Sequence, residues 1–299
     1  MRPPLERPGH VWVDGRLMPA EGAQLSVFDR GFQLGDGVFE TLRVRGGHAT
    51  ELVDHVARLK RSADGLGIDL PPDIEAMMTT AIAELTAAEG MAGPDGDASV
   101  RITVSRGAYA GRGLLPPDEI VRPTIVVQAW PVVAPAAGHL ERGITLATSA
   151  IRRDPENPLV ALKTTSRADY VHARLEARKA GADDALFLTI DGFLSEATTA
   201  NVFLISGAEL ATPALSCAIL PGTTRSWILG WGSRVGLTPI EGWLTRRDLV
   251  EADEAFVCSS VAGIIPVTGC DGSPIGSGMP GPWTLRARAD RETFIRGGS

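Results

Sequence analysis

The stretch PLVALKTTSRAD, residues 158–169, contains the residue around which we expect the chain to be organised, Lys163. An apolar run of β type, residues 159–162, precedes the lysine, and three hydroxyl residues, 164–166, follow it. This pattern predicts a strand that ends at the lysine and directs its amine into a cavity. Desolvation or a neighbouring cation can make such an amine nucleophilic. From these residues alone, an ordinary surface lysine is the alternative.

The composition is that of a globular protein. A chain of 299 residues is long enough for two domains of ordinary size. Its net charge of −7 at pH 7 predicts neither nucleic acid nor an anionic membrane surface as a partner. The N-terminal sequence lacks the apolar core of a signal peptide, and no run approaches the roughly 20 apolar residues of a membrane span. We therefore expect a cytoplasmic protein.

The three cysteines, Cys217, Cys258 and Cys270, do not have the spacing of metal ligands. Their odd number in so long a chain argues against a disulfide framework. The sequence thus predicts no metal site and a reducing compartment, which agrees with a cytoplasmic location.

Short strands and two helices are predicted for the N-terminal part. Three glycines, Gly31, Gly35 and Gly37, precede a strand at 38–44, and their density predicts a tight backbone that approaches another segment closely. Apolar residues at helical spacing predict helices over 52–66 and from Asp73 onward. Alternation and turn signals predict the remaining strands at 11–13, 99–105 and 124–129.

A proline- and alanine-rich stretch at 131–138 predicts a linker, and the pattern beyond it alternates strands with helices. This alternation predicts an α/β or α+β second domain. Strands are expected at 145–149, 184–190, 201–205 and 255–258, and helices at 166–180, 224–235 and over the last twenty residues.

Three features could hold a phosphate group. Thr223 and Thr224 stand at the predicted start of a helix, where free N–H groups and the helix dipole favour an anion. Ser259 and Ser260 end a predicted strand and offer further hydroxyls. Arg58, on a predicted helix, could add a permanent positive charge. Taken singly, these features are also explained as a helix cap, a turn and a solvated helix face.

Glu196 lies in FLSEATTANVFLI, an otherwise uncharged stretch, and buried charges are rare unless they are paired. Pyridoxal 5′-phosphate (PLP) would use all of these residues. Its aldehyde bonds to a lysine, its phosphate needs hydroxyls and a helix N-terminus, and its ring nitrogen needs a carboxylate. In this interpretation Lys163 moves the substrate proton and Glu196 keeps the ring nitrogen protonated.

Six segments resemble, in order from about residue 11 to residue 267, the class IV aminotransferases of fold type IV, the group of branched-chain and D-amino-acid aminotransferases and aminodeoxychorismate lyases. The resemblance rests on the combination and order of the segments, since each piece alone is unspecific. They are FDRGFQLGDGVFETLRV, HVARL, the lysine followed by a helix, SEATTANVF, ILPGTTR and SSVAGIIPV.

The resemblance implies a small N-terminal α/β domain (1–130), a linker (131–139) and a larger C-terminal domain of pseudo-barrel shape (140–299) that carries the lysine. It also implies PLP between the domains and a homodimer whose partner loop completes the pocket. By position it implies cofactor-binding roles for the following residues: Lys163 as the covalent and catalytic lysine, Glu196 at the ring nitrogen, Leu220 on the ring face, and Arg58, Thr223, Thr224, Ser259 and Ser260 at the phosphate.

The same resemblance places Phe39 and Glu40 on the substrate side, and Arg112 on a loop that supplies carboxylate-binding arginines. Phe39 stands where D-amino-acid aminotransferases often carry a carboxylate-binding tyrosine, so that contact is incomplete here. The loop RGAYAGRG and the pair 166–167 also resemble the lyases, whereas Glu40 replaces a threonine of the best-known bacterial lyases.

Three hypotheses follow. The first is a transaminase that moves an amino group between an amino acid, of D or L configuration, or an (R)-amine and a 2-oxo acid. The second is an aminodeoxychorismate lyase, which releases pyruvate and needs no amino acceptor. The third is a binding or structural protein in which Lys163 has no chemical role, and this predicts a colourless protein without a borohydride-trapped adduct.

Overall fold

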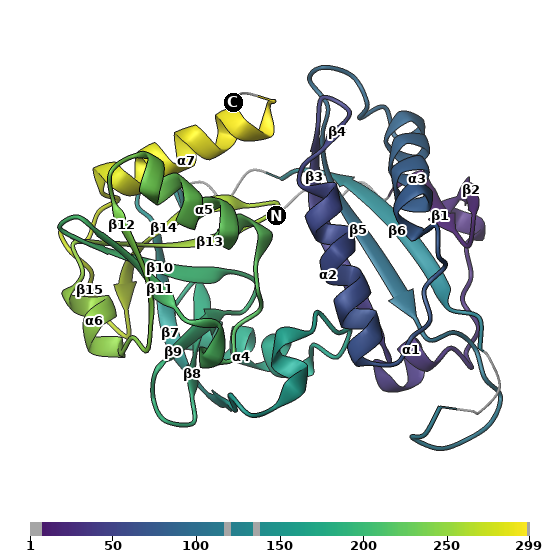
Figure 1. Ribbon diagram of the computed structural model, residues 1–299, viewed down its shortest axis with the longest axis horizontal. Coiled ribbons are helices and arrows are strands. Elements are labelled where there is room, and N and C mark those ends of the chain that lie inside the picture. The colour runs from purple at the N-terminus through teal and green to yellow at the C-terminus, as the bar shows by residue number, and fades with distance from the viewer. Residues whose placement is uncertain (1–7, 117–120, 134–137, 298–299) are drawn as a thin grey trace. The chain divides into compact units, whose positions relative to one another are not determined.

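The structure, a computed structural model, describes residues 8–116, 121–133 and 138–297. Its contacts divide the chain into two units, Met1–Val132 with Leu162–Ser166, and Val133–Ala161 with Arg167–Ser299. The division falls inside the predicted linker, and it groups Lys163 with the first unit, whereas the sequence prediction counted this residue in the second domain. Each unit combines helices with a sheet, which confirms the predicted α/β fold class (Figure 1).

The first unit contains a six-stranded sheet whose neighbouring strands run antiparallel to one another. The strand order is β2-β1-β6-β5-β3-β4. Positive φ angles at Asp14 and Gly15 form the hairpin turn between the first two strands. The strands are β1 (His10–Val13), β2 (Arg16–Pro19), β3 (Gly37–Arg45), β4 (His48–Ala49), β5 (Asp97–Ser105) and β6 (Thr124–Pro131).

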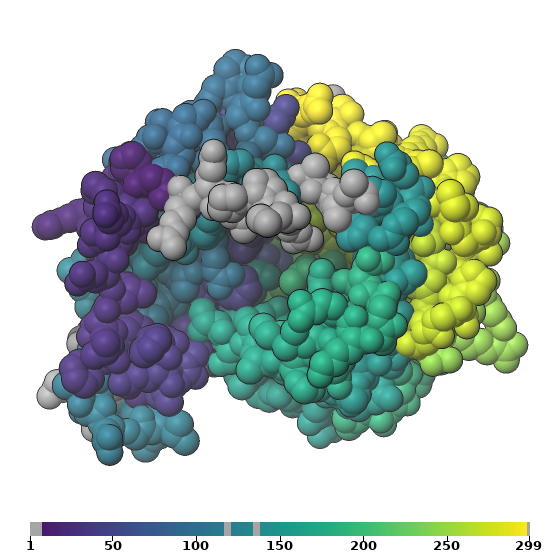
Figure 2. Space-filling model, turned by 180° about the vertical axis from the view of Figure 1, so that it is seen from behind, coloured from purple at the N-terminus to yellow at the C-terminus, as the bar shows by residue number. Residues whose placement is uncertain are grey.

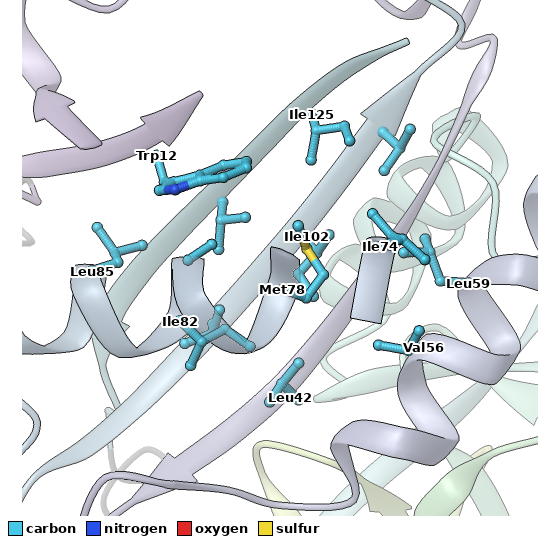
Figure 3. Packing of buried hydrophobic residues seen from close by; sticks show 14 of the residues in the cluster. Trp12, Leu42, Val56, Leu59, Ile74, Met78, Ile82, Leu85, Ile102 and Ile125 are labelled. Carbon is cyan, nitrogen blue, oxygen red and sulfur yellow. The ribbon is translucent and has the colours of Figure 1, made fainter. Parts of the chain in front are cut away.

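Two helices, α2 (Leu52–Gly65) and α3 (Ile74–Ala88), lie on one face of this sheet (Figure 1). Figure 3 shows their apolar side chains directed toward Leu42, Ile102 and Ile125 of the strands. The strand residues on this face are buried in alternation, as the pleat requires. The short helices of this unit are α1 (Arg30–Leu34) and η1 (Ala20–Gly22).

The second unit contains a nine-stranded mixed sheet in the order β12-β11-β10-β13-β14-β7-β8-β9, with β15 paired to β14. The parallel pairs are β11–β12, β14–β7 and β7–β8. The strands are β7 (Ile144–Arg153), β8 (Asp184–Thr189), β9 (Leu194–Ala197), β10 (Asn201–Ser206), β11 (Glu209–Pro213), β12 (Thr238–Gly242), β13 (Glu254–Ser259), β14 (Gly263–Cys270) and β15 (Ser273–Pro274).

The helices of the second unit are α4 (Ala168–Lys179), α5 (Thr223–Arg234), α6 (Arg246–Glu251), α7 (Pro282–Ile295), η2 (Pro158–Ala161) and η3 (Leu215–Cys217). Helices α5 and α7 share a core with β13 that includes the stacked rings of Phe203 and Phe256, whose centroids are 5.2 Å apart. The outer side of the C-terminal segment, yellow in Figure 2, is at the surface of the unit.

The prediction of a strand before Lys163 is wrong. Pro158–Ala161 forms the 3-10 helix η2 instead, and Leu159 is 47% exposed. The side-chain oxygen of Asn157 accepts a hydrogen bond from the backbone N–H of Leu159 at 3.0 Å, which closes a turn. Such a turn and a proline at the first helical position favour a helical start over an extended chain.

All three cysteines are buried, and none of them forms a disulfide. Burial, and then the charge of Asp271, raise the pKa of the Cys270 thiol to about 12. A thiol of this kind is a poor nucleophile, and burial assigns all three cysteines to the core. No helix in the described ranges has both the length and the hydropathy to cross a membrane.

Candidate functional site

The backbone of the lysine segment is fixed to the start of β3 and to α2. The N–H of Lys163 donates to the Ser62 hydroxyl at 3.1 Å, and its carbonyl accepts from the N–H of Phe39 at 2.9 Å. The N–H of Thr165 donates to the Gly37 carbonyl at 2.8 Å. The segment therefore runs beside β3 like a short additional strand, and the position of Lys163 is determined by long-range hydrogen bonds.

Two of the glycines that precede β3, Gly35 and Gly37, allow the lysine segment to lie this close to the start of β3. A Cβ atom on Gly37 would lie 2.7 Å from the Val104 carbonyl oxygen and 3.2 Å from Thr165 Oγ1. Gly35 has a φ of +67°, and a Cβ there would lie 2.5 Å from Ser166 Oγ. A side chain at Gly37 would collide with β5 and crowd Thr165, and one at Gly35 would collide with the Ser166 side chain and strain the backbone, which confirms the prediction of a tight backbone that approaches another segment.

The ring of Phe39 is in contact with Lys163 and with a cation that the sequence analysis missed, Arg101. The Lys163 Nζ is 4.7 Å from the centroid of the Phe39 ring, and the Arg101 guanidinium carbon is 3.9 Å from it. Arg101 is on β5, on the side of that strand that alternates away from the apolar core. A charged residue in the middle of an alternating strand was the signal that could have identified it.

Glu40, which was predicted on the substrate side, is fully buried in the first unit. Arg58 donates to both of its oxygens, from Nε at 2.8 Å and from Nη2 at 2.7 Å. His55 Nδ1 lies 2.7 Å from Glu40 Oε2, and it carries the proton because an ionised carboxylate can only accept. The substrate role of Glu40 and the phosphate role of Arg58 stay predictions.

The charge of Glu40 is favoured by its partners. Burial by itself would raise the pKa of the Glu40 carboxyl, but hydrogen bonds and charge attraction from Arg58 and His55 lower it from 4.5 to about 2. The pair is therefore ionised over the whole physiological range. His55 was not identified from the sequence, where it is one histidine among five.

In the second unit, Glu196 is buried and has three donors around its carboxylate. Arg153 Nη2 lies 3.4 Å from Oε1, while the N–H of Leu220 and the amide of Asn201 donate to Oε2 at 3.0 and 3.4 Å. Asn201 also donates to the carbonyl of Leu220 at 3.0 Å. The carboxylate is thus held in one orientation, next to the backbone of the predicted ring-packing residue Leu220.

Arg153, at the end of β7, connects Glu196 with Tyr170 of α4. It donates to the Tyr170 hydroxyl, and its guanidinium carbon is 4.7 Å from the centre of the tyrosine ring. Arg167 lies over the same ring at 3.2 Å. Burial, followed by the charge of Glu196, raises the pKa of Tyr170, so the phenol stays protonated at neutral pH. No local sequence signal distinguished Arg153 from its neighbour Arg152.

The predicted phosphate ligands of the second unit lie at the ends of two elements. Thr223 begins α5 and Ser260 follows β13, and their hydroxyl oxygens are 3.3 Å apart. The residue before Thr223 is Gly222, which has no side chain to cap the helix. Thr224, in the same turn, is buried, and Ser259 ends β13. Two hydroxyls and an uncapped helix N-terminus therefore face one location.

The loop of Arg112 is fixed by Arg30. The Arg30 guanidinium donates to the carbonyls of Gly113 and Leu114 at 3.2 and 2.8 Å, and it donates to Asp36 at 2.8 Å. Arg112 itself is exposed. Its role as a carboxylate ligand stays a prediction.

Comparisons with known proteins point to one family. The family model of class IV amino-transferases matches residues 37–270. A Methanocaldococcus jannaschii protein assigned as a branched-chain-amino-acid aminotransferase is 34% identical over 93% of both chains. The D-alanine aminotransferase of Bacillus licheniformis is 33% identical over 95% of this chain and 96% of its own.

Among solved structures, the T.th. branched-chain amino acid aminotransferase with pyridoxamine 5′-phosphate aligns with a TM-score of 0.90. It is 27% identical, and the alignment covers 98% of this chain and 96% of that one. The chain belongs to the class IV aminotransferase family. It is accordingly a PLP-dependent transaminase, as the sequence analysis expected.

The residues present fit this cofactor. The Thr223 and Ser260 hydroxyls at an uncapped helix start can hold a phosphate, and the oriented, buried carboxylate of Glu196 can hold a protonated ring nitrogen. Lys163, half-buried beside Phe39, can supply the amine.

We predict that Glu40→Gln destabilises the protein by about 3–5 kcal/mol at pH 7, because Arg58 then keeps a buried charge without its carboxylate. Glu75→Gln is the matched control, since its pair with Lys60 spans 4.0 Å and both side chains are about half exposed. We expect it to change the stability by less than about 0.5 kcal/mol. Urea denaturation of both variants and the wild type measures these values.

The difference in stability between the wild type and Glu40→Gln should depend on pH. The pKa of Glu40 is lower in the folded chain than its ordinary value of 4.5, so its contribution is complete above pH 4.5 and is lost as the pH falls toward 2. The stability difference between wild type and Glu40→Gln should shrink over this window. A difference that stays constant down to pH 2 would contradict the assignment of an ionised, paired Glu40.

Proposed function

We propose that the protein transfers an amino group between an amino acid and a 2-oxo acid. The observation that carries this proposal is the pair of cations beside Phe39, in which a guanidinium and the candidate reactive amine contact one ring. A substrate with a carboxylate next to its amino group needs such a combination, because the guanidinium binds the carboxylate while the lysine acts at the adjacent carbon.

Each residue has a role in this proposal. Lys163 would hold the cofactor through its amine, and the same amine, when free, would move the proton at the substrate α-carbon. Glu196 pairs with the cofactor ring nitrogen, and Arg153 and Asn201 keep its carboxylate oriented. Thr223, with Ser260, binds the phosphate. When bound, PLP supplies the electron sink for the carbon that loses the proton.

The wider site assignment is part of the same proposal. Leu220 packs on the cofactor ring, Thr224, Ser259 and Arg58 assist at the phosphate, and Phe39 lies on the substrate side. The relatives are assigned to branched-chain amino acids and to D-alanine, which supports an aliphatic amino acid of either configuration as the substrate class.

The proposal also includes a homodimer. Two aromatic side chains of the first unit, Phe28 and Phe32, are 49% and 77% exposed, and Leu114 and Leu115 of the Arg112 loop are 82% and 85% exposed. Apolar side chains gathered in this way are typical of a surface that a partner covers. The cytoplasmic location stays a prediction.

The function is tested by following the product with one amino donor at a time. We expect D- and L-forms of alanine and of branched-chain amino acids to react only when a 2-oxo acid is present, because the cofactor must be returned to its starting form. Neutral (R)-amines are included in the panel. Release of pyruvate from aminodeoxychorismate without an acceptor would show a lyase instead, and a colourless protein without activity would contradict both.

We predict that Lys163→Ala abolishes turnover and the borohydride-stable cofactor adduct while the fold persists, since the side chain is only half-buried and its backbone bonds are kept. Peptide mass mapping after borohydride reduction checks the adduct, and circular dichroism checks the fold. Lys60→Ala, at an exposed lysine of α2, is the control and should react like the wild type. Undiminished turnover in Lys163→Ala would exclude the assigned lysine.

We predict that Arg112→Ala raises the KM for 2-oxo acids and amino acids about tenfold to 100-fold more than the KM for neutral amines, because a charge-assisted hydrogen bond of roughly 1.5–3 kcal/mol is lost. Steady-state kinetics with both substrate classes measures this. The same measurement on Arg101→Ala compares the two candidate carboxylate ligands. A variant that affects both classes equally excludes its arginine from carboxylate binding.

A further inference from the structure

Arg291 of the C-terminal helix α7 is directed into the second unit. It is 1% exposed and belongs to the largest fully buried side chains of the described residues. The neighbouring arginine Arg286, on the same helix, is by contrast 52% exposed and pairs with Asp290. Burying a guanidinium is costly unless it makes polar contacts, so the position of Arg291 calls for a specific reason.

The Arg291 guanidinium lies between two aromatic rings and reaches the first turn of α5. Its carbon is 5.0 Å from the ring centroids of both Trp227 and Phe294. Its Nη2 donates to the hydroxyl of Thr224 at 3.4 Å. A hydrogen bond from Trp231 Nε1 to Asp290 at 2.8 Å also ties α7 to the C-terminal half of α5.

This start of α5 is an environment for an anion. The first turn contains no acidic residue, and Gly222 before it makes no side-chain cap. The hydroxyls of Thr223 and Ser260 face each other there at 3.3 Å. A cation behind the turn adds to the helix dipole, and in a buried location its attraction for an anion is screened only weakly.

We propose that Arg291 is a positioning residue of the phosphate site, an inference that rests on the proposed function of Thr223, Thr224 and Ser260. Its guanidinium fixes the Thr224 side chain at the helix start and places a buried positive charge behind the cofactor phosphate. The C-terminal helix thereby belongs to the cofactor-binding machinery, although it contributes no predicted phosphate ligand.

The test compares two ligands on the cofactor-free enzyme, PLP and pyridoxal, which lacks only the phosphate. In Arg291→Met and Arg291→Gln we expect the Kd for PLP to rise at least about tenfold, and the Kd for pyridoxal to stay within about twofold of the wild type. Arg291→Lys, which keeps the charge, should restore part of the PLP affinity. Arg286→Met is the control and should bind both ligands like the wild type.

Each outcome has a distinct meaning. Equal losses for both ligands in the neutral variants, or no loss for either, would overturn the phosphate role of Arg291. If the neutral variants do not fold by circular dichroism, Arg291→Lys decides, because a selective loss of PLP affinity supports the proposal and unchanged affinities for both ligands contradict it. If the wild type binds PLP no more tightly than pyridoxal, the proposed phosphate site itself is wrong.

Discussion

The close approach of the turn at Gly35 and Gly37 to the segment after Lys163 is the constraint on which the candidate reactive group depends. The lysine is not delivered by a strand of its own. Its backbone is held from both sides, by the Ser62 hydroxyl and by the N–H of Phe39. Since a Cβ at Gly35 would collide with Ser166 and one at Gly37 would crowd Thr165, a short turn early in the chain helps to determine where an amine much later in the chain is placed.

In both units a buried carboxylate is paired with an arginine. Glu40 receives two hydrogen bonds from Arg58, and Glu196 is approached by Arg153 and by two neutral donors. Burial alone would raise the pKa of the Glu40 carboxyl, whereas Arg58 and His55 lower it, and at Glu196 the three donors keep the side chain oriented. Charges that are fixed in this way need no rearrangement when a ligand arrives, which is the condition for electrostatic preorganisation.

The sequence predicted the elements whose pattern is local. Alternation identified β5 and β6, helical spacing identified α2 and α3, and the glycines before β3 were correctly interpreted as a close approach. The prediction failed at 158–161, where apolar residues suggested a strand and the side chain of Asn157 starts a helical turn instead. The spacing of apolar residues cannot distinguish the strand from the helical turn here, because the choice between them depends on one side-chain hydrogen bond.

The candidate site was predictable where the family resemblance has sequence motifs, as for Lys163 and Glu196. The arginines Arg101, Arg153 and Arg291 were not predictable, since their contacts are with residues that are distant in the sequence. Their chemistry depends on which neighbours the fold supplies. A guanidinium on a strand or helix has the same local pattern whether it is solvated or packed against aromatic rings.

The burial of the native thiols has a practical consequence. Cys217, Cys258 and Cys270 are each at most 2% exposed, so maleimide reagents will not reach them in the folded protein. A cysteine introduced at Leu114 or Leu115, both more than 80% exposed in the single chain, would be the one thiol open to labelling wherever a partner does not cover this surface. A fluorophore attached there would report directly on the loop that carries Arg112, in a background that requires no prior removal of cysteines.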